Sequence, residues 1–279
     1  MNMIDLHIHS SCSDGTLSPT QLVQLALDTH LSAFALTDHD TVAGLAEAFQ
    51  AARGTGLEVI AGIELSCEYK GKDIHIVGLD FDWEAPFFLQ ELTAFRDSRN
   101  IRNEEMIKKL IEHNIDISHK QMLDEYGETV WTRAHFARYL LEHGYVSDMQ
   151  EAFQCYIGDA APCYVPRKKV TPAQAVQLIR HTGGIPVLAH PMQYHFSVTE
   201  LETLVRELKK YGLIGIEAIY STHRAVDESL LRKLAKSLGL CISGGSDFHG
   251  SNKPTIALGT GTGNLKIPDS VLKQLREHR

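Results

Sequence analysis

The chain of 279 residues lacks several features that mark specialised classes of protein. No apolar run reaches about 18 residues, so we expect no membrane-spanning helix. The five cysteines are scattered, odd in number and without a CxxC pair, which favours reduced thiols over a disulfide framework or a cysteine-zinc site. The first residues show no basic region followed by an apolar stretch, so we expect no secretory signal and a cytoplasmic location.

Positive charge is also scarce, because 27 basic residues face 35 acidic ones and the formal net charge is −8 at pH 7. A broad basic surface for duplex nucleic acid is therefore not expected. The short basic run Arg167–Lys169 is interpreted as a solvated loop. Histidine, by contrast, occurs 15 times, and several histidines stand beside Asp or Glu. Histidine is the commonest protein ligand for metal ions, so its surplus indicates a metal site.

Short apolar runs alternate with helical patterns through most of the chain. We expect seven strands, at Ile4–His9, Ala33–Thr37, Glu58–Leu65, Asp73–Phe81, Ile185–Ala189, Gly215–Tyr220 and Leu240–Gly244. We expect helices from Pro19 with Ser18 as the cap, from about Thr41 to Gly54, and over Thr171–Thr182, Val198–Tyr211 and Ala225–Leu238. The alternation predicts an α/β fold with a mostly parallel sheet, either a barrel or a doubly wound sheet.

Residues 97–166 break this alternation, since they show helical patterns and no convincing strand. Helices are expected at Ile101–His113, Thr132–Glu142 and Asp148–Tyr156. We therefore predict an all-helical insertion over residues 97–166, within a domain formed by residues 1–96 and 167–279. Trp131 and Phe136 are interpreted as part of the core of this insertion.

The first predicted strand places Asp5, His7 and His9 on one face, because side chains alternate along a strand. In a parallel barrel this polar face points inward near the carboxyl end of the strand, where such barrels build their active sites. Two imidazoles at positions i and i+2 can bind one cation. An HxH pair alone belongs to an ordinary surface or core position about as often as to a metal site.

The same residue types recur at the ends of other predicted strands. They are Asp14 in the first loop, Asp38-His39-Asp40, Glu64, His75, His190 and Asp247-Phe248-His249. Any one of them alone is better explained as a helix cap or a hydrogen-bonded core residue. So many polar groups buried together at one end of a sheet would be very costly, and metal coordination removes that cost. The sequence therefore predicts a metal centre at this end.

Imidazoles and carboxylates without thiolates suit manganese, zinc, iron or magnesium, and we expect two or three divalent cations, with Mn²⁺ as the first candidate. Three such cations with the carboxylates of Asp14, Glu64 and Asp247 give a net charge of about +3, which attracts phosphate in spite of the acidic chain. Closely spaced cations also generate hydroxide at neutral pH and stabilise displacement at phosphorus. The pattern therefore predicts a phosphoesterase.

Seven motifs follow one another along the chain: His7-Ile8-His9, Asp14-Gly15, Thr37-Asp38-His39-Asp40, Gly62-Ile63-Glu64, His75-Ile76-Val77-Gly78, Ala189-His190-Pro191 and Gly245-Ser246-Asp247-Phe248-His249. As an ordered set they resemble the PHP (polymerase and histidinol phosphatase) family over nearly the whole chain. The resemblance implies a distorted seven-stranded (β/α)7 barrel, similar to a TIM barrel, with a trinuclear metal site.

The resemblance also implies which residues bind each metal. The nine implied ligands fall into three groups: His7, His9, Glu64 and Asp247 for the first metal, Glu64 again with His75 and His190 for the second, and Asp14, His39 and His249 for the third. Asp38 and Asp40 are then expected to orient imidazoles from behind.

The helical insertion, the stretch Thr132–Arg138, the segment Gly158–Pro166 and Ser221-Thr222-His223 resemble one branch of that family. Members of this branch hydrolyse nucleoside 3′,5′-bisphosphates to nucleoside 5′-monophosphate and phosphate, and some also degrade short RNA from its 5′ end. The chain departs at Met192-Gln193, where the branch usually has Gly-Arg. If that arginine touches substrate, one positive contact is lost here.

Five polar residues are candidate contacts for a phosphorylated substrate. Arg133 can hold a second phosphate with its planar guanidinium, and Arg138 lies one turn further along the helix, with His135 between them. His223 can contact phosphate or protonate the leaving group, and Ser221 stands beside it. We take Arg133 and His223 as candidate catalytic residues, although a solvated helix face or a surface histidine explains them about as well.

We therefore expect a metal-dependent phosphatase that removes the 3′-phosphate of nucleoside 3′,5′-bisphosphates, with hydroxide between two metals attacking phosphorus. A 5′-to-3′ exoribonuclease acting on short single-stranded, 5′-phosphorylated RNA is the first alternative. A metal-binding regulatory module is the second, disfavoured because all nine ligand positions are filled. Histidinol phosphate hydrolysis ranks lower, because Arg133 and Arg138 favour a second phosphate. Neither a membrane nor an obligate protein partner is expected.

Overall fold

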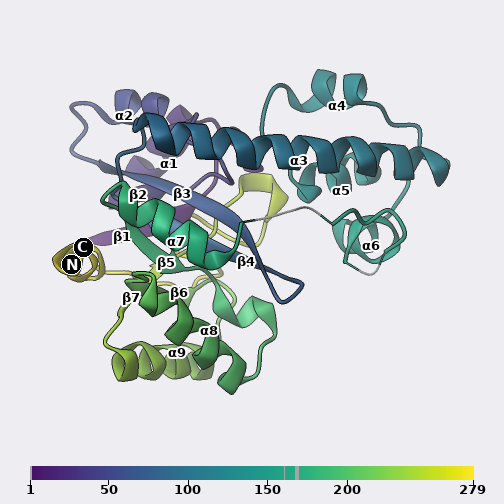
Figure 1. Cartoon of the computed structure of the whole chain (residues 1–279). Coiled ribbons are helices and arrows are strands. Elements are labelled where there is room, and N and C mark those ends of the chain that lie inside the picture. The colour runs from purple at the N-terminus through teal and green to yellow at the C-terminus, as the bar shows by residue number, and fades with distance from the viewer. Residues whose placement is uncertain (1, 160, 167–169) are drawn as a thin grey trace. The chain divides into compact units, whose positions relative to one another are not determined.

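The computed structural model describes residues 2–159, 161–166 and 170–279. Its strands form one sheet in which the order of neighbours follows the order in the chain (Figure 1). The strands are β1 (Met3–Ile8), β2 (Leu31–Leu36), β3 (Glu58–Tyr69), β4 (Lys72–Leu79), β5 (Ile185–Leu188), β6 (Gly215–Tyr220) and β7 (Cys241–Gly245). Each predicted strand is therefore present, with its ends shifted by a few residues.

Strand β4 departs from the parallel arrangement that the sequence predicted. It runs antiparallel to both β3 and β5, whereas the other neighbouring pairs are parallel. The cause is local, because Lys70 and Gly71 join β3 to β4 directly and adopt positive φ values of 52° and 77°. So short a connection joins antiparallel strands, while parallel strands need a crossover of a dozen or more residues.

The two edges of the sheet meet at the ends of β1 and β7. The amide of Asp247 donates to the carbonyl of His7 at 2.7 Å, and the amide of His9 donates to the carbonyl of Phe248 at 2.9 Å. These bonds nearly close the sheet, which confirms the predicted distorted seven-stranded barrel. They also bring the carboxyl ends of β1 and β7 side by side, where the predicted ligands lie.

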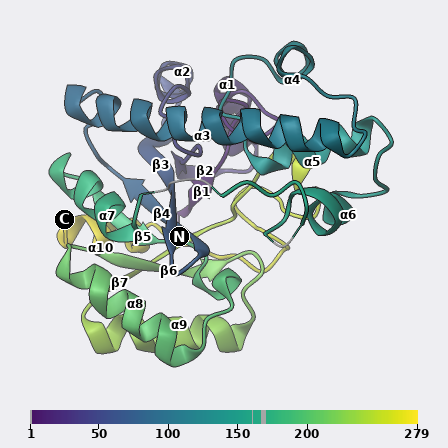
Figure 2. The same ribbon diagram turned by 45° about the vertical axis from the view of Figure 1, so that its right-hand side comes forward.

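Helices flank the strands of this barrel (Figures 1 and 2). They are α1 (Pro19–Asp28), α2 (Leu45–Ala52), α7 (Pro172–His181), α8 (Val198–Lys210), α9 (Ala225–Leu238) and α10 (Ser270–Glu277), with short 3₁₀ turns η2 (Pro191–Tyr194) and η3 (Gly250–Asn252). Ser18 caps α1 as predicted, and Gln21 completes a capping box. Within the described ranges, no helix is long and apolar enough to cross a membrane.

The chain divides into two compact units, Met1–Leu89 with Val170–Arg279, and Gln90–Lys169. The described residues of the second unit form helices, and the unit runs from residue 90 to residue 169, whereas the sequence placed the insertion at residues 97–166. Its helices are α3 (Pro86–Glu112), which begins in the first unit, α4 (His119–Tyr126), α5 (Arg133–Glu142), α6 (Met149–Ala152) and the π-helical turn η1 (Phe153–Ile157). The basic run Arg167–Lys169 lies outside the described residues.

The helical unit has an apolar core of its own. Met106, Leu110 and Phe136 are fully buried in it, and Trp131 is 7% exposed. The interpretation of Trp131 and Phe136 as core residues is thus confirmed. Helix α3 begins at Pro86, 15 residues before the start expected at Ile101. The sequence pattern missed this first part because its polar and apolar residues are mixed and form no clear amphipathic stripe.

Candidate metal centre

The HxH motif places two imidazoles at the carboxyl end of β1. His7 Nε2 lies 3.3 Å and His9 Nε2 lies 3.2 Å from the same oxygen, Oε2 of Glu64. Both rings are fully buried. Asp5, predicted on the same face, is used differently: its carboxylate accepts hydrogen bonds from the amides of Ser246 at 2.9 Å and Gly259 at 2.8 Å. Asp5 therefore ties β1 to the loops beyond β7.

Glu64, on β3, lies at the centre of the site. Its Oε2 also faces His39 Nδ1 at 3.1 Å, and its Oε1 faces His75 Nδ1 at 2.8 Å and His190 Nε2 at 2.9 Å. Burial opposes ionisation of this carboxyl, yet the surrounding imidazoles hold the pKa of Glu64 well below its usual range. One carboxylate thus faces five imidazoles, which is the arrangement expected of a bridging metal ligand.

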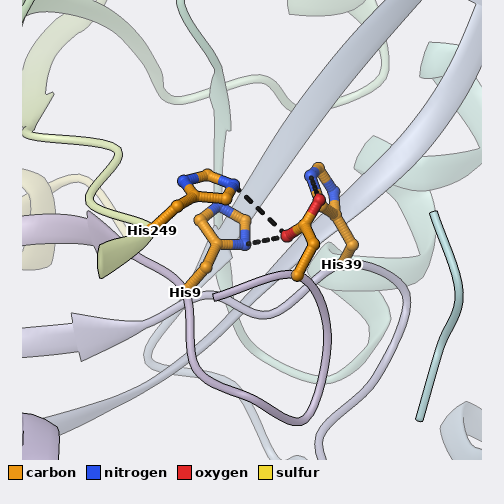
Figure 3. Close-up of side chains that lie close together, drawn as sticks. His9, His39 and His249 are labelled. Atoms are coloured by element: carbon orange, nitrogen blue, oxygen red, sulfur yellow. Dashed lines mark ion pairs between the residues drawn. The ribbon is translucent and has the colours of Figure 1, made fainter. Parts of the chain in front are cut away.

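A second carboxylate gathers three imidazoles beside the first group. Asp14 lies in the loop after β1, and its oxygens are 3.6 Å from His9, 3.7 Å from His39 and 3.2 Å from His249. Figure 3 shows His9, His39 and His249 turned toward one carboxylate, with dashed lines for the ion pairs. This group contains the three residues that the sequence assigned to the third metal position, together with His9, which the sequence assigned to the first.

His75 reaches the site because β4 is reversed. It lies near the start of β4, and in an antiparallel strand that end coincides with the carboxyl ends of the neighbours. Tyr194 fixes the position, since its hydroxyl accepts from the amide of His75 at 3.0 Å and donates to the carbonyl of Ala189 at 2.6 Å. One buried tyrosine therefore holds the backbone beside both His75 and His190.

Asp247 offers one carboxylate oxygen to the cluster and uses the other elsewhere. Its Oδ1 lies 3.3 Å from His9 Nε2, while its Oδ2 accepts from the Tyr220 hydroxyl and from Lys253 Nζ, each at 2.6 Å. Asp247 has a φ of 57°. Backbone strain of this kind persists where the surroundings over-determine it, as they do at functional sites.

Position 193 connects to Asp247 through Tyr220. Gln193 Nε2 donates to the Tyr220 hydroxyl at 2.6 Å, and that hydroxyl donates to Asp247. The family branch usually has arginine at this position, so the departure noted in the sequence falls on a neighbour of a candidate ligand. Sequence reasoning missed Tyr220 and Lys253, because neither stands next to a predicted ligand in the chain.

All nine predicted ligands meet in this structure. Their ligand atoms fall within 4.8 Å of one another in four overlapping groups: His9, Asp14, His39 and His249; His7, Glu64 and His190; His7, His9 and Asp247; and His39, Glu64 and His75. Ring nitrogens of His7, His9, His39 and His190 are buried and make no hydrogen bond of good geometry to the residues that the structure describes. That state is costly, and a cation removes the cost. The residues present therefore fit a multinuclear metal centre.

Asp38 does not orient an imidazole as expected. Its Oδ1 accepts from the amide of Ser10 at 2.8 Å and the hydroxyl of Ser13 at 2.6 Å, and its Oδ2 accepts from the Ser10 hydroxyl at 2.6 Å. Asp38 therefore shapes the loop that carries Asp14. Asp40 likewise accepts from a backbone amide, that of Ser66, at 2.9 Å.

Two candidate substrate contacts lie in the barrel unit. Ser221 is buried, and its hydroxyl donates to the carbonyl of Ser246 at 2.6 Å, directly before Asp247 in the chain. His223 Nδ1 donates to the carbonyl of Ala218 at 3.0 Å, so the opposite nitrogen carries the free lone pair of the neutral ring. That Nε2 atom is buried and has no hydrogen-bond partner within the described part of the chain.

The other candidates lie on α5 in the helical unit. Arg133 pairs with Asp159 at 2.6 Å and faces the rings of Phe153 and Tyr164. His135 Nδ1 accepts from the amide of Thr132 at 3.0 Å, which completes the cap of α5. Arg138 pairs with Glu142 at 2.7 Å, one turn further along the helix. Each of these side chains therefore has a local role in the helical unit.

The PHP domain model matches residues 5–182, more than half of the chain. The chain belongs to the PHP domain family. This PHP chain is 38% identical over 271 residues, 96% of each chain, to the 5′-3′ exoribonuclease of Haemophilus influenzae. It is 36% identical over 251 residues, 89% of this chain and 88% of the relative, to the 3′,5′-nucleoside bisphosphate phosphatase of Chromobacterium violaceum.

A solved structure from Chromobacterium violaceum supports the same assignment. That protein, named an amidohydrolase and solved with sulfate and without metal, superposes with a TM-score of 0.88 at 33% identity, covering 99% of this chain and 96% of the other. Family membership and the buried clusters together make this PHP protein a metal-dependent phosphoesterase.

Proposed function

We propose that this phosphoesterase hydrolyses the bond between phosphorus and the 3′-oxygen of a nucleotide that carries a 5′-phosphate. The leading substrate is a nucleoside 3′,5′-bisphosphate, which gives nucleoside 5′-monophosphate and phosphate. The observation that carries the proposal is the cluster of nine ligand residues with buried imidazole nitrogens, at the end of the barrel where the parallel strands have their carboxyl ends. Active sites of barrels of this type are built at that end.

We assign the nine residues to three metal positions as the family resemblance implies, with Glu64 between the first two. His7, His9 and Asp247 complete the first position, and His75 and His190 complete the second. Three divalent cations, Mn²⁺ in our proposal, would activate water for attack and hold the phosphate oxygens. The net charge of about +3 that results is suited to a substrate with two phosphates.

His223 is our candidate for the proton donor. Its ring packs against Tyr220 with centroids 5.0 Å apart, and the Tyr220 hydroxyl contacts the candidate ligand Asp247. Because Nδ1 already donates to the Ala218 carbonyl, the ring acts as a proton donor in its imidazolium form, which carries a second proton on Nε2. The buried Nε2 atom has no hydrogen-bond partner among the described residues, so it can donate this proton to a substrate atom. The departing 3′-oxygen needs a proton because an alkoxide is a poor leaving group.

Arg133 is our candidate for binding the 5′-phosphate. Asp159 and two aromatic rings hold its guanidinium in a defined orientation, and a planar guanidinium binds phosphate in a bidentate manner. We propose that substrate phosphate replaces part of the pairing with Asp159, which is itself 61% exposed.

A 5′-to-3′ exoribonuclease is the second candidate function, favoured by the 38% identical relative of that name. In RNA with a 5′-phosphate, the bond from phosphorus to the first 3′-oxygen is the same bond as in the bisphosphate. The two reactions differ only in whether the phosphorus carries a further nucleotide. One set of residues can therefore serve both.

The first experiment measures products from adenosine 3′,5′-bisphosphate and from a short 5′-phosphorylated RNA, with Mn²⁺ and with excess chelator. We expect adenosine 5′-monophosphate and phosphate from the first substrate only when metal is present. Release of nucleoside 5′-monophosphates from the RNA alone would replace the phosphatase by the exoribonuclease. Appearance of adenosine 3′-monophosphate would refute the choice of bond.

Two variants test the substrate contacts. Arg133→Met should raise KM for adenosine 3′,5′-bisphosphate by about 10- to 100-fold, as expected for a lost hydrogen bond to a charged group, and leave KM for adenosine 3′-monophosphate unchanged. Arg206→Met, which removes an exposed arginine of α8 paired with Glu202, is the control. His223→Asn should lower kcat on the bisphosphate by about 10²- to 10⁴-fold and spare 4-nitrophenyl phosphate, whose leaving group needs no proton. Equal losses on both substrates would exclude that role.

A further inference from the structure

Strand β6 contributes a buried carboxylate that the predicted ligand set leaves out. Glu217 is 2% exposed. Its Oε1 accepts from His7 Nδ1 at 3.0 Å, and its Oε2 accepts from the backbone amide of His190 at 2.7 Å. Each oxygen of Glu217 thus holds a different candidate metal ligand from behind.

The contact with His7 decides which ring nitrogen can bind a metal. A carboxylate only accepts hydrogen bonds, so His7 Nδ1 must carry the proton. The Nε2 atom, which faces Glu64 at 3.3 Å, then keeps its lone pair once the ring is neutral. A partner of this kind fixes both tautomer and orientation of a metal-bound histidine.

The contact with His190 holds a strained backbone. His190 has a φ of 23°, which non-glycine residues rarely adopt. Its amide points at Glu217 Oε2, and its Nε2 points at Glu64 Oε1 at 2.9 Å. The rings of His7 and His190 lie 5.7 Å apart and nearly parallel. Glu217 and Glu64 therefore hold the same two histidines from opposite sides.

We propose that Glu217 is a positioning residue that prepares the first two metal positions together, through His7 and through His190. The proposal rests on the use of the cluster as a metal centre and is independent of the substrate. It predicts that one change at Glu217 weakens two metal positions, while the third, with Asp14, His39 and His249, keeps its affinity.

Glu217→Gln isolates this role because it conserves shape. Both groups that face Glu217 are N–H donors, whereas an amide offers one acceptor and one donor. The backbone amide of His190 cannot change, so the glutamine oxygen should face it and the NH₂ group should face His7. His7 must then either lose its hydrogen bond or place its proton on Nε2, where it blocks the metal.

The test titrates metal-stripped wild type, Glu217→Gln and the surface control Glu202→Gln with Mn²⁺, and counts bound metal at each free concentration. Loss of such an outer partner typically costs 10- to 100-fold in affinity. We expect this loss at two positions in Glu217→Gln, so that about one metal per chain remains at limiting Mn²⁺. The control should match wild type.

Nuclear magnetic resonance of the zinc-loaded proteins provides a second readout. The Nδ1 proton of His7 should be present and hydrogen-bonded in wild type, and shifted or absent in Glu217→Gln. Wild-type metal affinities together with an unchanged Nδ1 proton in Glu217→Gln would overturn the proposal. Failure of the substrate assignment looks different, since wild type would then bind metal normally and release no phosphate from adenosine 3′,5′-bisphosphate.

Discussion

Gly245→Ala tests how tightly the end of β7 must approach β1 for the metal centre to form. A Cβ atom at position 245 would lie 2.2 Å from the Cβ of His7 and 2.6 Å from its amide nitrogen. Ordinary van der Waals contact begins at 3.4 Å, so one strand must move by at least about 1.2 Å. Asp247 follows two residues later and would move with it, whereas metal–ligand distances tolerate only about 0.2 Å.

Two effects of different size follow from this displacement. Overpacking should lower the free energy of unfolding by about 1–3 kcal/mol. Misplacement of Asp247 against His7 by about 1 Å should lower kcat by roughly 10²-fold. Urea unfolding measures the first effect, and bound Mn²⁺ with phosphate release measures the second.

Gly54→Ala is the matched control, because its Cβ would contact nothing although φ is +76°. It should cost about 1–2 kcal/mol from the left-handed backbone and keep full metal content. Gly245→Ala with wild-type metal content and turnover would show that the close approach of β7 to His7 does not matter to the site.

Three further predictions concern charge and packing. Burial lowers the pKa of His9, but Asp247 and neighbouring carboxylates raise it to about 9. A metal must displace that proton, so Mn²⁺ affinity should rise about tenfold per pH unit up to pH 9 and then level off. Calorimetry that shows no dependence of this affinity on pH would contradict the prediction. The raised pKa also means that metal-free stability should fall as pH rises through about 9. Lys253→Met leaves the buried Asp247 without its ammonium partner, and should destabilise the metal-free protein by about 1–2 kcal/mol after allowance for solvent screening. In urea unfolding, saturating Mn²⁺ should restore most of this lost stability. An equal loss of stability with and without metal would argue against a cation at Asp247. Phe136→Ala empties a fully buried position in the core of the helical unit and should lower the free energy of unfolding of that unit by about 3–5 kcal/mol. The amount of bound metal should not change. Loss of metal would show that the core of the helical unit supports the metal centre.

The strands and candidate ligands could be predicted from the sequence because both follow local rules. Alternation puts His7 and His9 on one face of β1, and the ends of strands show where Glu64 and Asp247 should meet them. His75 joins the cluster for a reason that the sequence did not show. The expected sheet was mostly parallel, whereas the turn at Lys70–Gly71 reverses β4 and so brings the start of that strand to the site.

The partners that hold the ligands were not predictable, because they depend on contacts between distant parts of the chain. Glu217 lies 210 residues from His7, inside a strand that reads as an ordinary apolar run. Asp38 stands next to His39 in the sequence and yet holds Ser10 and Ser13. Adjacency in sequence suggested the wrong partner, since the carboxylate of Asp38 faces the loop from β1 instead of a ring.

The most direct measurement is phosphate release from adenosine 3′,5′-bisphosphate as a function of Mn²⁺ bound per chain, starting from chelator-stripped protein. We predict no turnover in the stripped protein, and turnover that appears once more than one metal is bound and is abolished again by chelator. Turnover that survives complete removal of metal would contradict the assignment of the cluster as the catalytic metal centre. So would the absence of hydrolysis at full loading on both the bisphosphate and short 5′-phosphorylated RNA.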